Sequence, residues 1–249
     1  MPKRLANRSC KQDRRGQSST RFIMISNLVL KISVTIAFIA MIIVNGLANI
    51  LPIGGLTTGE LSDLYPNLFT PAGVTFSIWG GVIYAFLALY VIYQFGVFKK
   101  QNPKQVQLIQ QVNRWFLRSS FANIAWIFAW HYQIIWLSVI IMLVLLYSLI
   151  RIAGLVNHRP FSFREQAFVR VPFSIYFGWI TIATIANISV LLVSIQWDGF
   201  GLSDAFWMIA VLIVGALIGI AGILKNQNIF YGLVFIWAYG GILLKHLSE

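Results

Sequence analysis

The side chains that could do chemistry in this sequence are tryptophans and amides set within long apolar stretches. Asn123 stands three residues before Trp126, and a later stretch carries Trp179 and Asn187. An amide in hydrocarbon needs a hydrogen-bond partner, and a deep indole offers one N–H donor and a large flat face. Such residues either hold helices together or line a pocket for a flat apolar ligand. Taken one at a time, they favour contacts between helices.

The sequence gives little support for acid–base catalysis, metal binding or ion transport. No Asp, Glu, Lys or Arg lies in the middle of an apolar stretch, which argues against ion pumps and proton-coupled carriers. The three histidines, His131, His158 and His246, are too scattered for a metal site. No phosphate-loop, serine-hydrolase or zinc-protease motif occurs. We therefore expect no metal, no cofactor and no enzymatic activity; an enzyme acting on a bound pigment through its tryptophans is the least favoured alternative.

The composition decides what kind of chain holds these residues. Of 249 residues, 58% are hydrophobic and only 10% are charged, against about 25% charged residues in an average soluble domain. Mean hydropathy is +0.76. Cys10 is the single cysteine, so no internal disulfide can form. These values exclude a soluble enzyme, a disordered chain, a coiled coil and a disulfide-built secreted domain, and they predict an all-α, polytopic membrane helical bundle.

Charge-free windows predict seven transmembrane helices. A span needs about 20 residues to cross the hydrocarbon core. The window 119–150 is too long for one span, and its centre, Trp130-His131-Tyr132-Gln133, is typical of a membrane surface. We therefore expect two helices joined by a tight hairpin there. The predicted spans are about 28–52, 73–95, 115–132, 134–152, 171–195, 206–224 and 228–245.

The net charge of +12 supports this count and predicts the orientation. With seven spans and a cytoplasmic N-terminus, every Lys and Arg except Lys245 falls on the cytoplasmic side, as the positive-inside rule requires. The C-terminus then lies outside. Most of the acids also fall outside: Glu60, Asp63, Asp198, Asp204 and Glu249. A single span over 119–150 would place the basic loop 151–170 outside and break the pattern.

Two segments outside the spans carry further expectations. Residues 1–27 form a basic cytoplasmic tail that we expect to be disordered and to touch lipid headgroups rather than nucleic acid. The first span follows it as an uncleaved anchor. The loop 53–72 is long and contains glycines, prolines and apolar residues. Such a loop is either a plain connector or a lid that folds back over the bundle.

Three motifs in chain order resemble the TspO/MBR family, the tryptophan-rich sensory proteins related to the translocator protein. The fifth predicted span reads Trp179-Ile-Thr181-Ile-Ala183-Thr184-Ile-Ala-Asn187, similar to the family's fifth helix. The third contains Asn123-Ile-Ala-Trp126, and the second opens with Phe69-Thr-Pro71 and continues through Trp79 to Tyr84. The long loop before the second span and the short hairpin after the third also match. The resemblance covers residues 28–195.

The resemblance implies a five-helix core over 28–195 with two additional transmembrane helices over 196–249. It implies a sensory or binding protein of the cell (cytoplasmic) membrane, with a porphyrin-like or sterol-like hydrophobic ligand and a homodimer. The implied ligand-binding residues are Trp79, Tyr84, Asn123, Trp126, Trp179, Thr184 and Asn187. Gly215, Gly219 and Gly222 place small residues on one face of the sixth span, where they permit either close packing on the core or dimer contact. A transporter or permease component for a small hydrophobic compound is the alternative.

Overall fold

The computed structural model describes residues 2–51, 53–97, 102–157 and 159–248, except for the side chains of 2–24, 76, 77, 79 and 248. The ordered elements in this part of the chain are all helical. They are α1 (Pro2–Ile50), η1 (Ile53–Gly55), α2 (Thr58–Asp63), α3 (Gly73–Tyr93), α4 (Pro103–His131), α5 (Ile135–Val156), α6 (Phe163–Glu165), the π-helical η2 (Gln166–Arg170), α7 (Val171–Ser194), η3 (Gly199–Gly201), α8 (Asp204–Asn226) and α9 (Ile229–Ser248).

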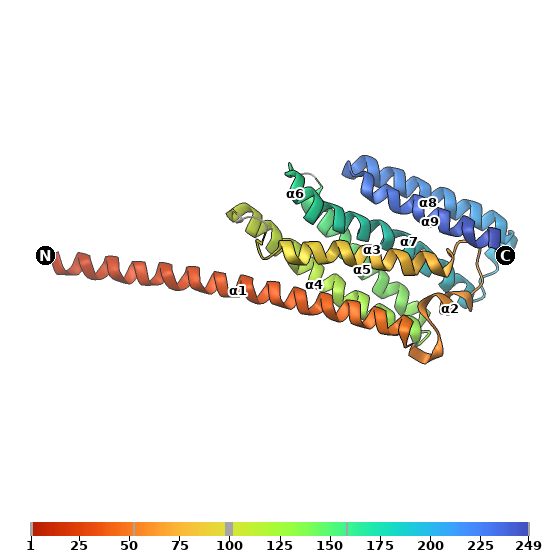
Figure 1. The fold of residues 1–249 in the computed structure, drawn as a ribbon, viewed down its shortest axis with the longest axis horizontal. Coiled ribbons are helices and arrows are strands. Elements are labelled where there is room, and N and C mark those ends of the chain that lie inside the picture. The colour runs from red at the N-terminus through yellow and green to blue at the C-terminus, as the bar shows by residue number, and fades with distance from the viewer. Residues whose placement is uncertain (1, 52, 98–101, 158, 249) are drawn as a thin grey trace.

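The long helices form a bundle with a helical hairpin on one flank (Figure 1). Within the bundle, α4 packs closely against α5 and α1, and α7 packs against α5 and α3. The hairpin of α8 and α9 joins the bundle mainly through contacts between α9 and α7. Helix α8 is the most peripheral, since only Gly215 and Gly219 are buried along it. The principal core therefore lies among α1, α3, α4, α5 and α7.

Six of these helices are long and apolar enough to cross a membrane, which makes the chain a multi-pass membrane protein. They are Ile25–Ile50, Gly73–Tyr93, Ile135–Val156, Phe163–Ser194, Asp204–Asn226 and Ile229–Leu247. Helix α4 is absent from this set because its N-terminal half carries Lys104, Arg114 and Arg118. The seventh span and the orientation of the termini therefore stay predictions, as does the disorder of residues 1–27, which lie largely outside the described side chains.

The third helix is longer than the predicted span 115–132, which it contains almost entirely. Helix α4 begins at Pro103, because Asn102 and Gln105 form a capping box: the Gln105 N–H donates to Asn102 Oδ1 at 2.9 Å and the Asn102 N–H donates to Gln105 Oε1 at 3.0 Å. Proline suits the first helical position, where its missing N–H is not needed. The basic residues in the first turns of α4 lower its mean hydropathy, but the helix continues through them.

The predicted hairpin between the third and fourth spans is confirmed. Helix α4 ends at His131 and α5 begins at Ile135. The turn between them places Gln133 in the left-handed region, with φ of 55°, and the Ile134 N–H donates to the Ala129 carbonyl at 2.9 Å. The two helices therefore run antiparallel, side by side, along most of their length (Figure 1).

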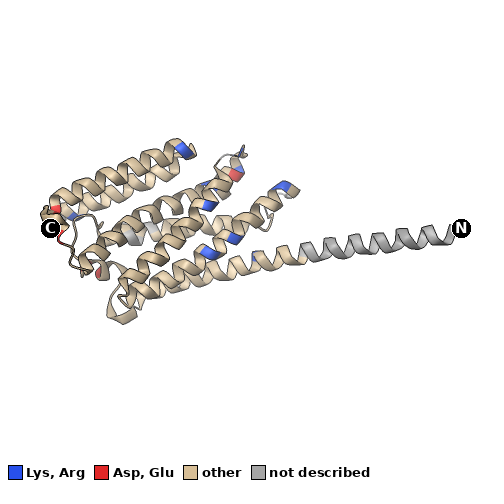
Figure 2. Ribbon diagram, turned by 180° about the vertical axis from the view of Figure 1, so that it is seen from behind, with Lys and Arg blue, Asp and Glu red and all other residues tan. Residues whose placement is uncertain are grey.

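Charge is distributed along the bundle axis. Most described lysines and arginines lie toward one end, whereas Asp and Glu gather mainly at the other (Figure 2). Among the residues whose side chains are described, Glu165 is the acid at the basic end, and its carboxylate accepts from Gln105 Nε2 at 2.8 Å. At the acidic end, Lys245 Nζ lies 2.9 Å from Asp63 Oδ1. This polarity matches the arrangement expected of a bundle oriented by its basic loops.

Candidate ligand-binding site

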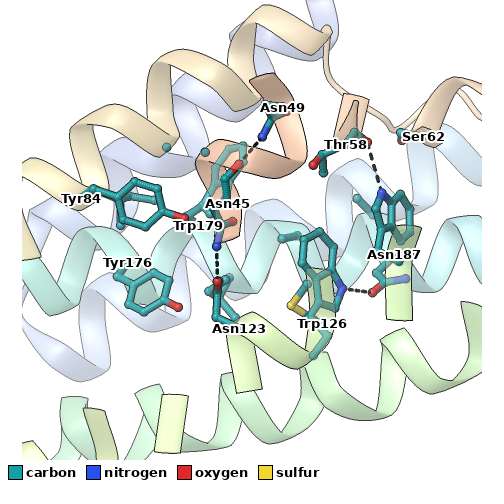
Figure 3. A pocket seen from close by; sticks show the side chains of 18 of the residues that line it. Asn45, Asn49, Thr58, Ser62, Tyr84, Asn123, Trp126, Tyr176, Trp179 and Asn187 are labelled. Carbon is teal, nitrogen blue, oxygen red and sulfur yellow. Dashed lines mark hydrogen bonds between the residues drawn. The ribbon is translucent and has the colours of Figure 1, made fainter. Parts of the chain in front are cut away.

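A cavity of about 330 Å³ lies among α1, α3, α4, α5 and α7, beneath α2 (Figure 3). Its volume is at the lower end of the range for pockets that take small organic ligands. Its wall is mostly apolar and aromatic, with a few amides and hydroxyls. The lining residues are Ile42, Asn45, Gly46, Asn49, Ile50, Thr58, Ser62, Gly80, Gly81, Ile83, Tyr84, Asn123, Trp126, Trp130, Met142, Tyr176, Trp179, Ile180, Ala183, Ala186, Asn187 and Val190.

Amides join α1 to α4 at the cavity wall. Asn45 Nδ2 donates to Asn123 Oδ1 at 2.7 Å and to the Met41 carbonyl at 2.9 Å. Asn49 Nδ2 donates in turn to the Asn45 carbonyl at 2.9 Å (Figure 3). These bonds satisfy donors that would be costly to leave unpaired in an apolar surrounding. The same amides therefore hold two helices together and present polar atoms to the cavity.

A second polar group joins α4, α5 and α7. Trp126 Nε1 donates to Asn187 Oδ1 at 2.9 Å, and Asn187 Nδ2 donates to Ser138 Oγ at 2.9 Å. The indole of Trp126 also stacks on that of Trp130, with ring centroids 5.5 Å apart and an interplanar angle of 20°. The orientation of Trp126 is thus determined by one hydrogen bond and one ring contact, and its ring remains part of the wall.

Three aromatic residues complete the opposite wall. Tyr84 comes from α3, and Tyr176 and Trp179 come from α7, one helical turn apart (Figure 3). Tyr176 is buried, and its hydroxyl lies 3.9 Å from Met41 Sδ. Trp179 is partly exposed. The cavity thus has flat faces on two sides and hydrogen-bonding groups between them.

The first part of the segment 53–72, which contains α2, folds back over this cavity. Thr58 and Ser62, both in α2, line it, and Trp130 Nε1 donates to the Thr58 carbonyl at 3.2 Å. His131 ring nitrogens lie 3.0 Å from the Ile53 carbonyl and 3.2 Å from Thr58 Oγ1. These contacts attach the segment to the end of α4.

Glu60 caps α2 and keeps the segment helical. The Thr57 N–H donates to Glu60 Oε2 at 2.7 Å, while Thr57 Oγ1 accepts from the Glu60 N–H at 3.3 Å. The backbone bond from Thr57 lowers the pKa of the Glu60 carboxyl below its ordinary value, and the Thr57 side chain acts in the same direction. The cap is therefore present at neutral pH and is lost only as the pH falls through that lowered pKa.

The structure brings five of the seven predicted site residues to this one cavity. They are Tyr84, Asn123, Trp126, Trp179 and Asn187. Thr184 is buried but does not line the cavity, and its hydroxyl donates to the Ile180 carbonyl at 2.6 Å within α7. The side chain of Trp79 lies outside the described residues. No measurement of binding tests any of these roles, so they stay predictions.

Several residues that line this cavity were not among the seven predicted site residues. Asn45 is an amide in α1 whose contact with Asn123 on α4 makes it part of the wall, and no motif in the sequence indicates that contact. Tyr176 stands three residues before Trp179, a helical spacing that could have indicated a shared face. Ser138 supports the wall through its hydrogen bond with Asn187 and is not itself a lining residue, and this contact between two helices has no such spacing signal. The searched residues bring no three metal-binding side chains together.

These features define a multi-pass helical membrane protein with an aromatic and amide-lined cavity. The family model described as TSPO-like protein matches residues 31–249, and the chain belongs to this family. The match includes α8 and α9, which sequence reasoning set apart from the five-helix core. No curated protein and no solved structure matches the chain.

Proposed function

We propose that the protein binds a flat hydrophobic ligand, tetrapyrrole-like in shape, in the cavity beneath α2, and that it acts as a membrane sensor rather than as an enzyme. The observation that carries this proposal is the wall itself: indole and phenol rings on opposite sides, with Asn123 and Asn187 between them. Apolar burial supplies the affinity of such a site, and a few placed polar groups supply the orientation.

Small residues give the cavity its width. A Cβ added at Gly46, Gly80 or Gly81 would meet no atom within 4 Å. All three glycines line the cavity. The space in front of them is therefore open and would accept the edge of a planar ligand. Family membership adds to this proposal, since a TSPO-like chain is expected to bind hydrophobic compounds.

We propose the membrane topology predicted from charge: seven spans including α4, with the N-terminus in the cytoplasm and the protein in the cell membrane. Cys10, the single cysteine, provides the test. We expect a membrane-impermeant maleimide to leave Cys10 unlabelled in intact cells and to label it after permeabilisation. Leu247→Cys in a Cys10→Ser background should show the opposite result. Labelling of Cys10 from outside would contradict the orientation.

Filling the cavity should weaken binding without unfolding the protein. Gly80→Val places two methyl groups in open space, and we expect it to raise the dissociation constant for protoporphyrin IX by about tenfold or more, since overfilled sites exclude ligand. Quenching of tryptophan fluorescence in detergent measures the affinity. Trp179→Phe should weaken binding less, because a smaller ring still forms part of the wall.

Two matched variants control this experiment. Gly154→Val makes the same substitution on α5. No atom lies within 4 Å of a Cβ added there, and Gly154 is not among the described residues that line the cavity. Trp136→Phe removes an indole that is exposed and outside the cavity. Both should bind as the parent protein does. If Gly80→Val binds protoporphyrin IX as tightly as Gly154→Val, the cavity is not the tetrapyrrole site.

Transport of a small hydrophobic compound is the second candidate. Gly81 lines the cavity and is also exposed, so the cavity approaches the lipid-facing surface of α3. The cap formed by α2 covers a different side. A compound could enter from the bilayer and leave past α2. Flux of a fluorescent tetrapyrrole across vesicles containing the protein, compared with vesicles containing Gly80→Val, distinguishes this function from sensing.

A further inference from the structure

A second cavity, of about 210 Å³, lies at the acidic end of the bundle, where α7 ends and α8 begins. Among the residues that the structure describes, the two cavities share no lining residue. Its wall is formed by the segment before α3, the last turns of α7, the connection to α8 and the first turns of α8. The lining residues are Pro66, Asn67, Leu68, Phe69, Ser189, Leu192, Val193, Trp197, Asp198, Gly199, Leu202, Asp204, Trp207, Met208 and Val211.

Two indoles form one wall of this cavity. The rings of Trp197 and Trp207 lie 4.8 Å apart at an interplanar angle of 60°, and Phe200 contacts Trp197 edge-on at 5.3 Å. Trp207 Nε1 donates to the Gly199 carbonyl at 2.9 Å, which holds its ring in place. Aromatic residues at span ends commonly anchor a protein in the interface. Here they also enclose a cavity, which an anchoring role does not require.

The connection from α7 to α8 is shaped to hold this arrangement. Gly199 has φ of +62°, and a Cβ added there would lie 3.0 Å from Trp207 Nε1. Asp198 Oδ1 accepts from the Phe200 N–H at 3.1 Å, and Ser203 caps α8 by accepting from the Phe206 N–H at 3.3 Å. The backbone of this connection is therefore tied at both ends of the aromatic wall.

The charge on the cavity is negative. Asp198 and Asp204 both line it, and neither forms an ion pair with another described residue. No lysine, arginine or histidine is among the described residues that line it. The lysine at this end of the bundle, Lys245, is paired with Asp63. A cation approaching from this side meets two carboxylates without an ion-pair partner among the described residues, in a cavity that two indoles also line.

We propose that this cavity binds an organic ammonium group, such as the quaternary ammonium of choline. Indole faces attract large, weakly hydrated cations, and carboxylates at the edge add Coulomb attraction. The ammonium group comes either from a soluble molecule or from a choline lipid headgroup at the membrane surface.

Choline and its neutral isostere 3,3-dimethylbutanol provide the test, because they differ in charge and share a shape. The full-length protein in detergent should bind choline saturably, and at least about fivefold more tightly than the isostere, since cation–π and carboxylate attraction act on the cation alone. Asp204→Asn and Trp197→Leu should each weaken choline binding by about fivefold or more. Isothermal titration calorimetry measures all of these affinities.

Matched variants separate the site from general effects. Glu60→Gln removes another exposed acid at the same end and keeps a side chain that can cap α2, and Trp136→Leu removes an exposed indole elsewhere. Both should bind choline as the parent does, and so should Gly80→Val, which alters only the first cavity. If Trp197→Leu fails to fold, Asp204→Asn still decides the question, because Asp204 is exposed.

Nanodiscs distinguish the two sources of the ammonium group. Equal choline affinity in phosphatidylcholine and phosphatidylglycerol nanodiscs would show that the site takes a soluble ammonium compound. Weaker choline binding in phosphatidylcholine would show that the headgroup of a choline lipid occupies the same site and competes with free choline. Equal binding of choline and the neutral isostere, unchanged affinity in Asp204→Asn, or absence of saturable binding in both detergent and phosphatidylglycerol nanodiscs would overturn the proposal.

Discussion

Gly178→Ala should destabilise the protein by about 1–3 kcal/mol, because the added methyl group has nowhere to go. Gly178 lies on α7 at a contact with α9: its Cβ would stand 2.8 Å from the Tyr231 carbonyl oxygen and 2.9 Å from Val234 Cβ. A backbone carbonyl cannot rotate aside as a side chain can. The steric cost should exceed the roughly 1 kcal/mol that alanine gains over glycine in a helix.

The thermal midpoint in detergent, followed by the loss of the monodisperse size-exclusion peak, measures this effect. Gly154→Ala is the matched control, since it makes the same change on α5 with no atom within 4 Å of the new Cβ. That control should leave the midpoint unchanged or raise it. Equal midpoints for the two variants would show that α9 does not pack on α7 as closely as described.

Asn113→Leu should destabilise the protein by about 2–4 kcal/mol, because it leaves two buried polar side chains without their partner. Tyr90, Gln94 and Asn113 are all 0% exposed. Tyr90 Oη donates to Asn113 Oδ1 at 2.6 Å, and Asn113 Nδ2 donates to Gln94 Oε1 at 2.8 Å. Gln94 Nε2 then reaches Thr35 Oγ1 at 3.1 Å, so the chain of bonds joins α4 to α3 and α1.

A double-mutant cycle tests whether this network acts as a unit. Tyr90→Phe removes only the hydroxyl that Asn113 accepts from. The Tyr90→Phe/Asn113→Leu double variant should therefore lose less stability than the sum of the two single variants, by at least about 0.5 kcal/mol. Strict additivity would show that the bond contributes nothing beyond the packing of each side chain. Thermal midpoints in the same detergent supply the comparison.

Most of the helical layout could be predicted from the sequence, because the absence of charge marks a membrane span directly. The windows around α3, α5, α7, α8 and α9 agree with the observed helices to within a few residues. The start of α4 could not be predicted this way. Its first turns carry basic residues along one side and bury Leu108, Ile109 and Val112 on the other, so their mean hydropathy resembles that of a loop.

The site could be predicted in part, for a similar reason. Residue type and spacing identified Asn123, Trp126 and Asn187, yet which partner each amide takes depends on how the helices cross. The burial of Asn113 and Gln94 could not be predicted, because both lie near charged residues at span ends, where polar side chains are ordinarily solvated. Only the packing of α1 and α3 against α4 removes them from water.

The second cavity could not be predicted from the sequence. Trp197 and Trp207 stand on either side of a connection between two helices, and nothing in a linear pattern indicates that their rings meet at 4.8 Å. The positive φ of Gly199 brings them together. Gly199→Ala should therefore be tolerated poorly, because it combines backbone strain with a close approach to the Trp207 ring.

The stack of Trp126 on Trp130 gives the protein an optical reporter of its own cavity. The electronic transitions of two indoles whose centres lie 5.5 Å apart are coupled. Their near-ultraviolet circular dichroism is therefore a property of the pair rather than of either ring. Both rings line the cavity, and Trp130 also holds α2 through the Thr58 carbonyl. Any occupant that tilts one ring, or any movement of α2, would change the sign or amplitude of that signal without an added label.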